Sequence, residues 1–174
     1  MSAARLLIAG LGNIFLGDDG FGPAVIEKLR LLPAFAGVRL VDFGVRAREL
    51  ARALQECDAA ILVDATARGE PPGTLYILEP CLTPPADSQQ DALGLLDGHS
   101  LTAEQVLRTL PSEAQPRILR ILGCEPETLE PDAADMGLSP VVQAAVQAAV
   151  PMIERLMAEL FAELALRAGA SAHA

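Results

Sequence analysis

Three carboxylates in the first half of the chain stand where chemistry is possible. Asp18 and Asp19 follow a short apolar run and lie among glycines, directly before a segment with helical spacing. Aspartate is favoured at the start of a helix because its carboxylate accepts backbone N–H groups, so capping explains one of the two. Asp64 ends an apolar stretch, where it either caps the next turn or takes part in chemistry.

One histidine, His99, stands outside the last few residues of the chain. It follows a long polar segment and precedes a predicted helix, a place where a lone histidine is more often structural than functional. Together with Asp19 and Asp64 it forms a set of oxygen and nitrogen donors without thiolates. Such a set suits Zn²⁺ or Ni²⁺ better than Mg²⁺ or Cu⁺, and three protein ligands leave positions open for a bound group. The long intervals between these residues carry little specificity by themselves.

Apolar runs that are typical of strands alternate with segments of helical periodicity. Strands are predicted at 6–9, 38–43, 59–64, 74–78 and 117–124, and helices at 20–32, 46–56, 100–110 and from Ser139-Pro140 onward. This alternation predicts an α/β fold: a single three-layer domain over 1–167 with a mostly parallel sheet of about five strands and helices on both faces. Residues 168–174 are expected to form a disordered tail. In such folds ligands bind beyond the carboxyl ends of the strands. The segments that carry Asp19, Asp64 and His99 each follow a predicted strand, so they are expected to lie at that edge of the sheet.

Several classes of function are disfavoured. The glycine-rich loop from Gly10 lacks the third glycine of a dinucleotide fingerprint, because Phe15 takes that place, and its paired aspartates repel a pyrophosphate. The net charge of −10 argues against binding to nucleic acid or to anionic membranes. No apolar segment is long enough to span a bilayer. Three cysteines without CxxC spacing argue against disulfides and thiolate zinc sites, which favours a reducing cytoplasm.

The ordered motifs resemble those of the hydrogenase maturation proteases over nearly the whole chain. The most specific is Gly12-Asn13-x-x-x-x-Asp18-Asp19-Gly20-x-Gly22, directly after the first predicted strand. The others follow in order: Asp42-Phe43-Gly44, Val63-Asp64-Ala65, Pro72-Gly73-Thr74, His99-Ser100-Leu101, Gly123-Cys124-Glu125-Pro126-Glu127 and Gly137-Leu138-Ser139-Pro140.

This resemblance implies an endopeptidase that removes the C-terminal peptide of a [NiFe] hydrogenase large-subunit precursor after nickel insertion. Carried over to this chain, the catalytic and nickel-contacting residues are Asp19, Asp64 and His99. The nickel is that of the precursor's active site, whose cysteines supply further ligands, although other divalent ions are able to occupy the site. A non-catalytic, nickel-sensing assembly factor on the same fold is the alternative.

Neighbouring residues are expected to support this set. Asn13 and Gly20 are expected to orient the first loop, and Asp18 either does the same or acts as a base. Arg46 and Arg48 follow the second predicted strand, where the family more usually has a small, glycine-bearing turn. They either bring positive charge to the substrate or are simply solvated. No nucleophile is assigned.

Overall fold

The computed structural model describes residues 5–80, 102–103, 106–107, 110–111, 115–129 and 137–171. Its five strands form one sheet in the order β2-β1-β3-β5-β4. Their bounds are β1 Leu6–Leu11, β2 Val38–Gly44, β3 Ala59–Ala65, β4 Leu75–Leu78 and β5 Ile118–Cys124. All neighbouring strands run parallel except β4, which pairs antiparallel with β5. The mostly parallel, five-stranded α/β sheet is therefore confirmed.

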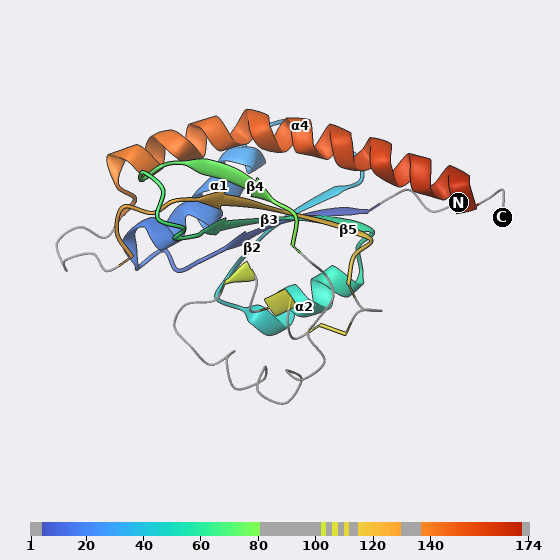
Figure 1. The fold of residues 1–174 in the computed structure, drawn as a ribbon, viewed down its shortest axis with the longest axis horizontal. Coiled ribbons are helices and arrows are strands. Elements are labelled where there is room, and N and C mark those ends of the chain that lie inside the picture. Colours follow the sequence, from blue (N-terminus) through green and yellow to red (C-terminus); the bar gives the residue numbers. More distant parts are fainter. Residues whose placement is uncertain are drawn as a thin grey trace.

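Helices cover both faces of the sheet (Figure 1). Their bounds are η1 Gly17–Gly20, a 3₁₀ helix, then α1 Phe21–Arg30, α2 Ala47–Gln55 and α4 Pro140–Ser171. α1 and α4 lie on one face and α2 lies on the other (Figure 1). Ala103, Val106 and Leu107 are also helical and belong to the predicted helix 100–110, of which the remaining part lies outside the described residues.

β1 and β3 are buried along their whole length, which explains why their sequences are apolar except for Asp64 near the end of β3. Because successive side chains of a strand point to opposite faces, Leu6 and Ile8 pack under α1 and α4, whereas Leu7 and Ala9 pack under α2. The edge strands β2 and β4 are only half-buried. The same alternation in β3 places Ala60, Leu62 and therefore Asp64 on the α2 face.

The last helix begins as the sequence predicts. Ser139 accepts the Val142 N–H through its hydroxyl at 3.4 Å, and Pro140 is the first helical residue. The helix ends later than predicted: it includes residues 168–171, which were expected to belong to the tail. Residues 172–174 lie outside the described residues. Near this end of the helix, Arg167 donates to Glu163 one turn earlier at 2.6 Å and to the Arg117 carbonyl at 3.1 Å.

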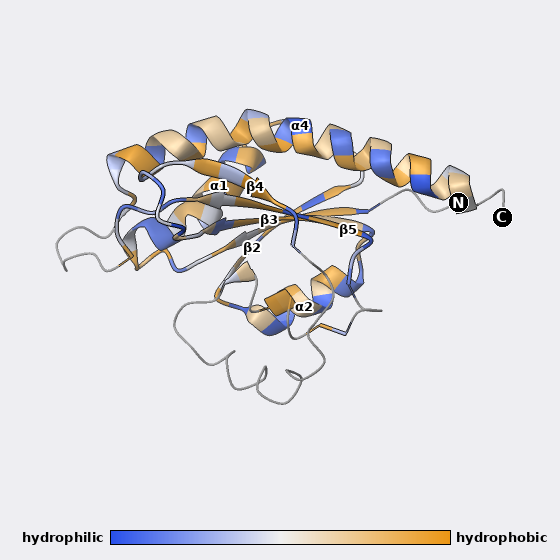
Figure 2. Ribbon diagram, viewed as in Figure 1, coloured by the Kyte–Doolittle hydropathy of each residue, from blue (hydrophilic) through white to orange (hydrophobic). Residues whose placement is uncertain are grey.

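No helix in the described part of the chain is long and apolar enough to cross a membrane. α4 is the longest, and hydrophilic residues interrupt its hydrophobic ones along its length (Figure 2).

The strand order creates one switch point. From β1 the chain moves outward to β2 on one side and then returns to place β3 on the other side of β1. The carboxyl ends of β1 and β3 are neighbours, with Gly10 paired to Val63. In open α/β sheets ligands bind at such a point, and here it lies between the loop after β1 and Asp64.

Candidate active site

Two glycines bring the first loop against the sheet. Gly12 has φ +120°, and a Cβ there would lie 1.8 Å from the Asp19 carbonyl oxygen. Gly22, near the start of α1, packs so closely that a Cβ would lie 2.3 Å from the Leu11 carbonyl oxygen and 2.4 Å from that of Val63. A side chain at either position would push η1 and α1 away from the ends of β1 and β3. These contacts fix Asp19 at the switch point.

Asp19 lies in η1 with 8% of its surface exposed. Its Oδ2 accepts the backbone N–H of Asn13 at 2.6 Å. Burial raises the pKa of the Asp19 carboxyl, and the hydrogen bond from Asn13 opposes this shift. An anionic carboxylate held in this environment gains from a nearby cation, because the cation compensates for the lost hydration.

Asp64 is 2% exposed near the end of β3. Its Oδ2 accepts the backbone N–H of Ala103 at 3.0 Å. The donor lies 39 residues further along the chain, so Asp64 does not merely cap the turn that follows it. The bond ties β3 to the described part of the helix that begins shortly after His99.

Asp18 is fully buried beside Asp19 but faces a different set of groups. Its carboxylate accepts the backbone N–H groups of Glu127 at 2.8 Å, Thr128 at 3.1 Å and Ser139 at 2.7 Å, and the Ser139 hydroxyl at 2.9 Å. These four bonds join η1 to the turn after β5 and to the start of α4. In this arrangement Asp18 orients loops, and its oxygens are engaged within the protein.

Asn13 organises the turn between β1 and η1. Its side-chain Oδ1 accepts the Phe15 N–H at 3.0 Å, and its carbonyl accepts the Leu16 N–H at 3.0 Å. Gly20 ends η1 and packs against this turn, because a Cβ there would lie 3.4 Å from the Ile14 Cα. Both residues thus contact the loop that they are expected to orient.

His99 lies outside the described residues, so of the three predicted ligands the structure places two: Asp19 in η1 and Asp64 near the end of β3. Within the described ranges, no group of three or more His, Cys, Asp or Glu residues is arranged to hold a metal ion. Carboxylates are hard oxygen donors, and a divalent ion held by Asp19 and Asp64 would need its remaining ligands from elsewhere.

Arg46 is more than a solvated charge. Its guanidinium donates to the carbonyls of Phe43, at 2.9 Å, and Asp42, and it pairs with Glu49 at 3.3 Å. Arg46 therefore holds the turn between β2 and α2. Arg48 is exposed.

Glu125, directly after β5, is a further buried carboxylate, and its role is not evident from the sequence motif that contains it. It is 5% exposed and accepts the Tyr76 hydroxyl at 2.7 Å and the N–H groups of Arg68 at 2.8 Å and Gly69 at 3.1 Å. Burial acts to raise the pKa of Glu125, but the bonds from Tyr76 and the backbone outweigh it and leave that pKa below its usual value. The network fixes the segment after Asp64. The sequence feature that could have indicated Glu125 is a carboxylate at the end of an apolar strand, the same feature that indicated Asp64.

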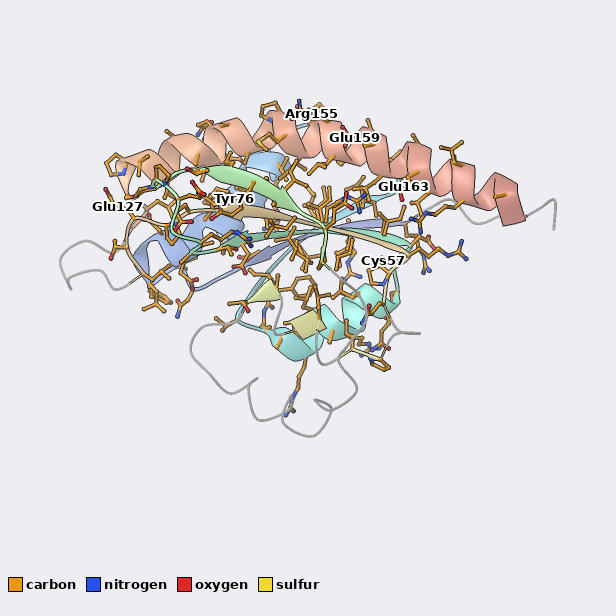
Figure 3. The ribbon with its side chains drawn as sticks, viewed as in Figure 1. Cys57, Tyr76, Glu127, Arg155, Glu159 and Glu163 are labelled. Atoms are coloured by element: carbon orange, nitrogen blue, oxygen red, sulfur yellow. The ribbon has the colours of Figure 1, made fainter. Side chains whose placement is uncertain are left out.

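The described cysteines offer no ready nucleophile. Burial is the main cause that raises the pKa of Cys124 to about 12 and that of Cys57 to about 11. Cys57 also lies at the end of the molecule away from Tyr76 and Glu127 (Figure 3). Both thiols are therefore protonated near neutral pH.

Comparisons with known proteins agree on one family. A model of the hydrogenase maturation protease family matches residues 23–156. The hydrogenase 2 maturation protease of Escherichia coli is 32% identical over 163 residues, with 90% of each chain covered. Among solved structures, the hydrogenase maturating endopeptidase HybD from E. coli superposes with a TM-score of 0.69 at 26% identity, covering 89% of this chain and 93% of that one. A hydrogenase 2 maturation peptidase from a Thaumarchaeota archaeon superposes with a TM-score of 0.67 at 29% identity, covering 88% of this chain and 98% of that one. The chain therefore belongs to the hydrogenase maturation protease family and is an endopeptidase.

Proposed function

We propose that this protein removes the C-terminal peptide of a [NiFe] hydrogenase large-subunit precursor, and that it does so after nickel has entered the precursor. The observation that carries the proposal is the placement of two buried carboxylates, Asp19 and Asp64, at the switch point of the sheet. The similarity to proteins that are named as maturation proteases supports the choice of substrate.

The Asp19 carboxylate accepts the Asn13 N–H and the Asp64 carboxylate accepts the Ala103 N–H, which fixes the direction of each carboxylate. In the proposal these carboxylates, together with the His99 imidazole, contact the nickel that the precursor carries. A divalent ion in contact with the scissile carbonyl or with a water supplies Lewis acidity. Cleavage then inserts one water across one peptide bond, giving a carboxylate on the mature subunit and an amine on the released peptide.

An incomplete set of ligands makes recognition conditional. Two carboxylates and an imidazole bind a metal weakly alone and more tightly when the cysteines of the precursor complete the coordination. The protein therefore gains affinity only for the nickel-loaded precursor, and this difference in affinity acts as a checkpoint. We also propose a cytoplasmic location, consistent with free thiols at Cys57 and Cys124.

Turnover tests the proposal. A substoichiometric amount of protein is mixed with precursor prepared with and without nickel, and intact masses are measured over time. The proposal predicts that a short C-terminal peptide is lost from the nickel-loaded precursor alone. Stoichiometric binding without a change in mass would instead identify a nickel-sensing assembly factor, and equal cleavage of both forms would remove the checkpoint.

A further inference from the structure

Two consecutive large apolar side chains are exposed next to Asp19. Ile14 is 57% exposed and Phe15 is 63% exposed. All five phenylalanines of the chain lie in its described part, and Phe15 is the one that is exposed. Single exposed apolar residues are ordinary, but an adjacent pair beside a candidate active site indicates a surface that another molecule covers.

The pair is held in a fixed turn. Asn13 accepts the Phe15 N–H, and the Asp19 N–H donates to the Leu16 carbonyl at 3.1 Å. The Asp19 carboxylate accepts the Asn13 N–H, so the same turn also orients the candidate catalytic carboxylate. A turn ordered in this way loses little conformational entropy when a partner binds it.

A pocket of about 410 Å³ adjoins the pair. Ile14 and Leu138 form two of its apolar walls, and Glu27, Arg30 and Asp42 also line it. Gly20 lies between the walls, since a Cβ there would be 3.4 Å from Ile14 Cα and 3.6 Å from Leu138 Cδ2. The pocket therefore combines apolar and charged lining, as surfaces used in protein–protein recognition do.

We propose that Ile14, Phe15 and this pocket bind an apolar patch on the folded body of the large-subunit precursor, apart from the peptide that is removed. This inference rests on the proposed function. The turn is continuous with Asp19, so Ile14 and Phe15 lie beside the place that a scissile bond reaches when it approaches Asp19. A second copy of this chain is a poorer occupant, because two bodies that each carry a net charge of −10 repel one another.

Phe15→Ser and Ile14→Ser test the proposal, with Leu31→Ser and Leu166→Ser as matched controls. The control residues are 77% and 76% exposed, after the end of α1 and near the end of α4. The dissociation constant of the nickel-loaded precursor is measured by biolayer interferometry, and thermal unfolding confirms that each variant is folded. We expect Phe15→Ser to weaken binding about tenfold, because truncating a well-buried interface side chain costs more than about 1 kcal/mol, and the controls to change it less than about twofold.

Kinetics separates docking from chemistry. Phe15→Ser is expected to raise the KM for the precursor by the same factor and to leave kcat unchanged at saturating precursor. Equal affinities for the wild type and Phe15→Ser would overturn the proposal. So would a wild-type dimer in sedimentation velocity that Phe15→Ser dissociates, because it would assign the surface to a second copy. Binding that depends on Phe15 without any cleavage by the wild type would overturn the proposed function and support the docking surface.

Discussion

Replacement of Asp18 by asparagine is expected to loosen three segments at once. Three donors, the N–H groups of Glu127 and Thr128 and the Ser139 hydroxyl, converge on Oδ2, and the Ser139 N–H donates to Oδ1. An asparagine side chain has only one acceptor oxygen. In either orientation its NH₂ group faces at least one backbone N–H, which leaves a buried donor without a partner.

The magnitude follows from the nature of these bonds. A hydrogen bond to a charged group contributes about 1.5–3 kcal/mol, and a buried donor left unpaired costs about 1–3 kcal/mol. We therefore expect the free energy of unfolding of Asp18→Asn to fall by about 2–4 kcal/mol. At roughly 2–4 °C per kcal/mol for a chain of this size, Tm falls by about 4–16 °C.

Thermal unfolding followed by circular dichroism measures the loss, and hydrogen exchange locates it. Exchange is expected to accelerate at the amides of Glu127, Thr128 and Ser139. Asp58→Asn is the matched control: Asp58 accepts the Arg5 N–H at 2.9 Å, but its side chain is 33% exposed. That variant is expected to lose less than about 1 kcal/mol. Equal Tm values for the two variants would show that the Asp18 network does not stabilise the loops.

Three further predictions concern the other buried groups. Asp19→Glu keeps a carboxylate and is expected to retain more precursor processing, by intact mass, than Asp19→Ala; equal losses would mean that the carboxylate is not used. Tyr76→Phe removes a donor to Glu125 and is expected to cost about 1–3 kcal/mol at pH 7 in chemical denaturation. Because the folded-state pKa of Glu125 is lowered, its share of this stabilisation is present above the usual glutamate pKa and is lost as the pH falls. The difference in stability between the two proteins should therefore shrink in acid to the part that comes from the Tyr76 bond to the Thr66 carbonyl, and a difference that does not change with pH would refute the role of ionised Glu125. With a pKa of about 11, Cys57 is expected to react with iodoacetamide at pH 8 roughly 100-fold more slowly than an unperturbed thiol. Peptide mass mapping follows the alkylation of Cys57 over time, and equal alkylation rates in native and denatured protein would contradict this.

The sheet could be predicted because its buried strands have distinctive sequences. β1 is an apolar run and β3 is apolar up to Asp64, since both faces of each strand are covered. The N-cap serine and the following proline at Ser139-Pro140 likewise indicate the start of α4. The end of α4 was not predictable from local sequence. Near that end Arg167 contacts the Arg117 carbonyl, which lies 50 residues away along the chain, and no local pattern indicates such a contact.

The candidate site was predictable only in part, for a similar reason. Glycine spacing and the paired carboxylates locate the first loop, but they do not say which aspartate faces which partner. The division between Asp18, which faces α4, and Asp19, which faces Asn13, arises from contacts made across the fold. The Glu125–Tyr76 bond likewise joins β4 to the residue that follows β5, 49 residues away along the chain, and no local pattern indicates it.

The central claim is that the Asp19 and Asp64 carboxylates recognise nickel carried by the precursor. The most direct test measures the affinity of the wild type and of Asp64→Asn for precursor with and without nickel. The asparagine amide keeps an oxygen for the Ala103 N–H but loses the negative charge, so the fold is expected to persist. The account predicts that the wild type binds nickel-loaded precursor at least about tenfold more tightly than nickel-free precursor, and that Asp64→Asn binds both forms equally. An Asp64→Asn variant that keeps the full preference for nickel would contradict it.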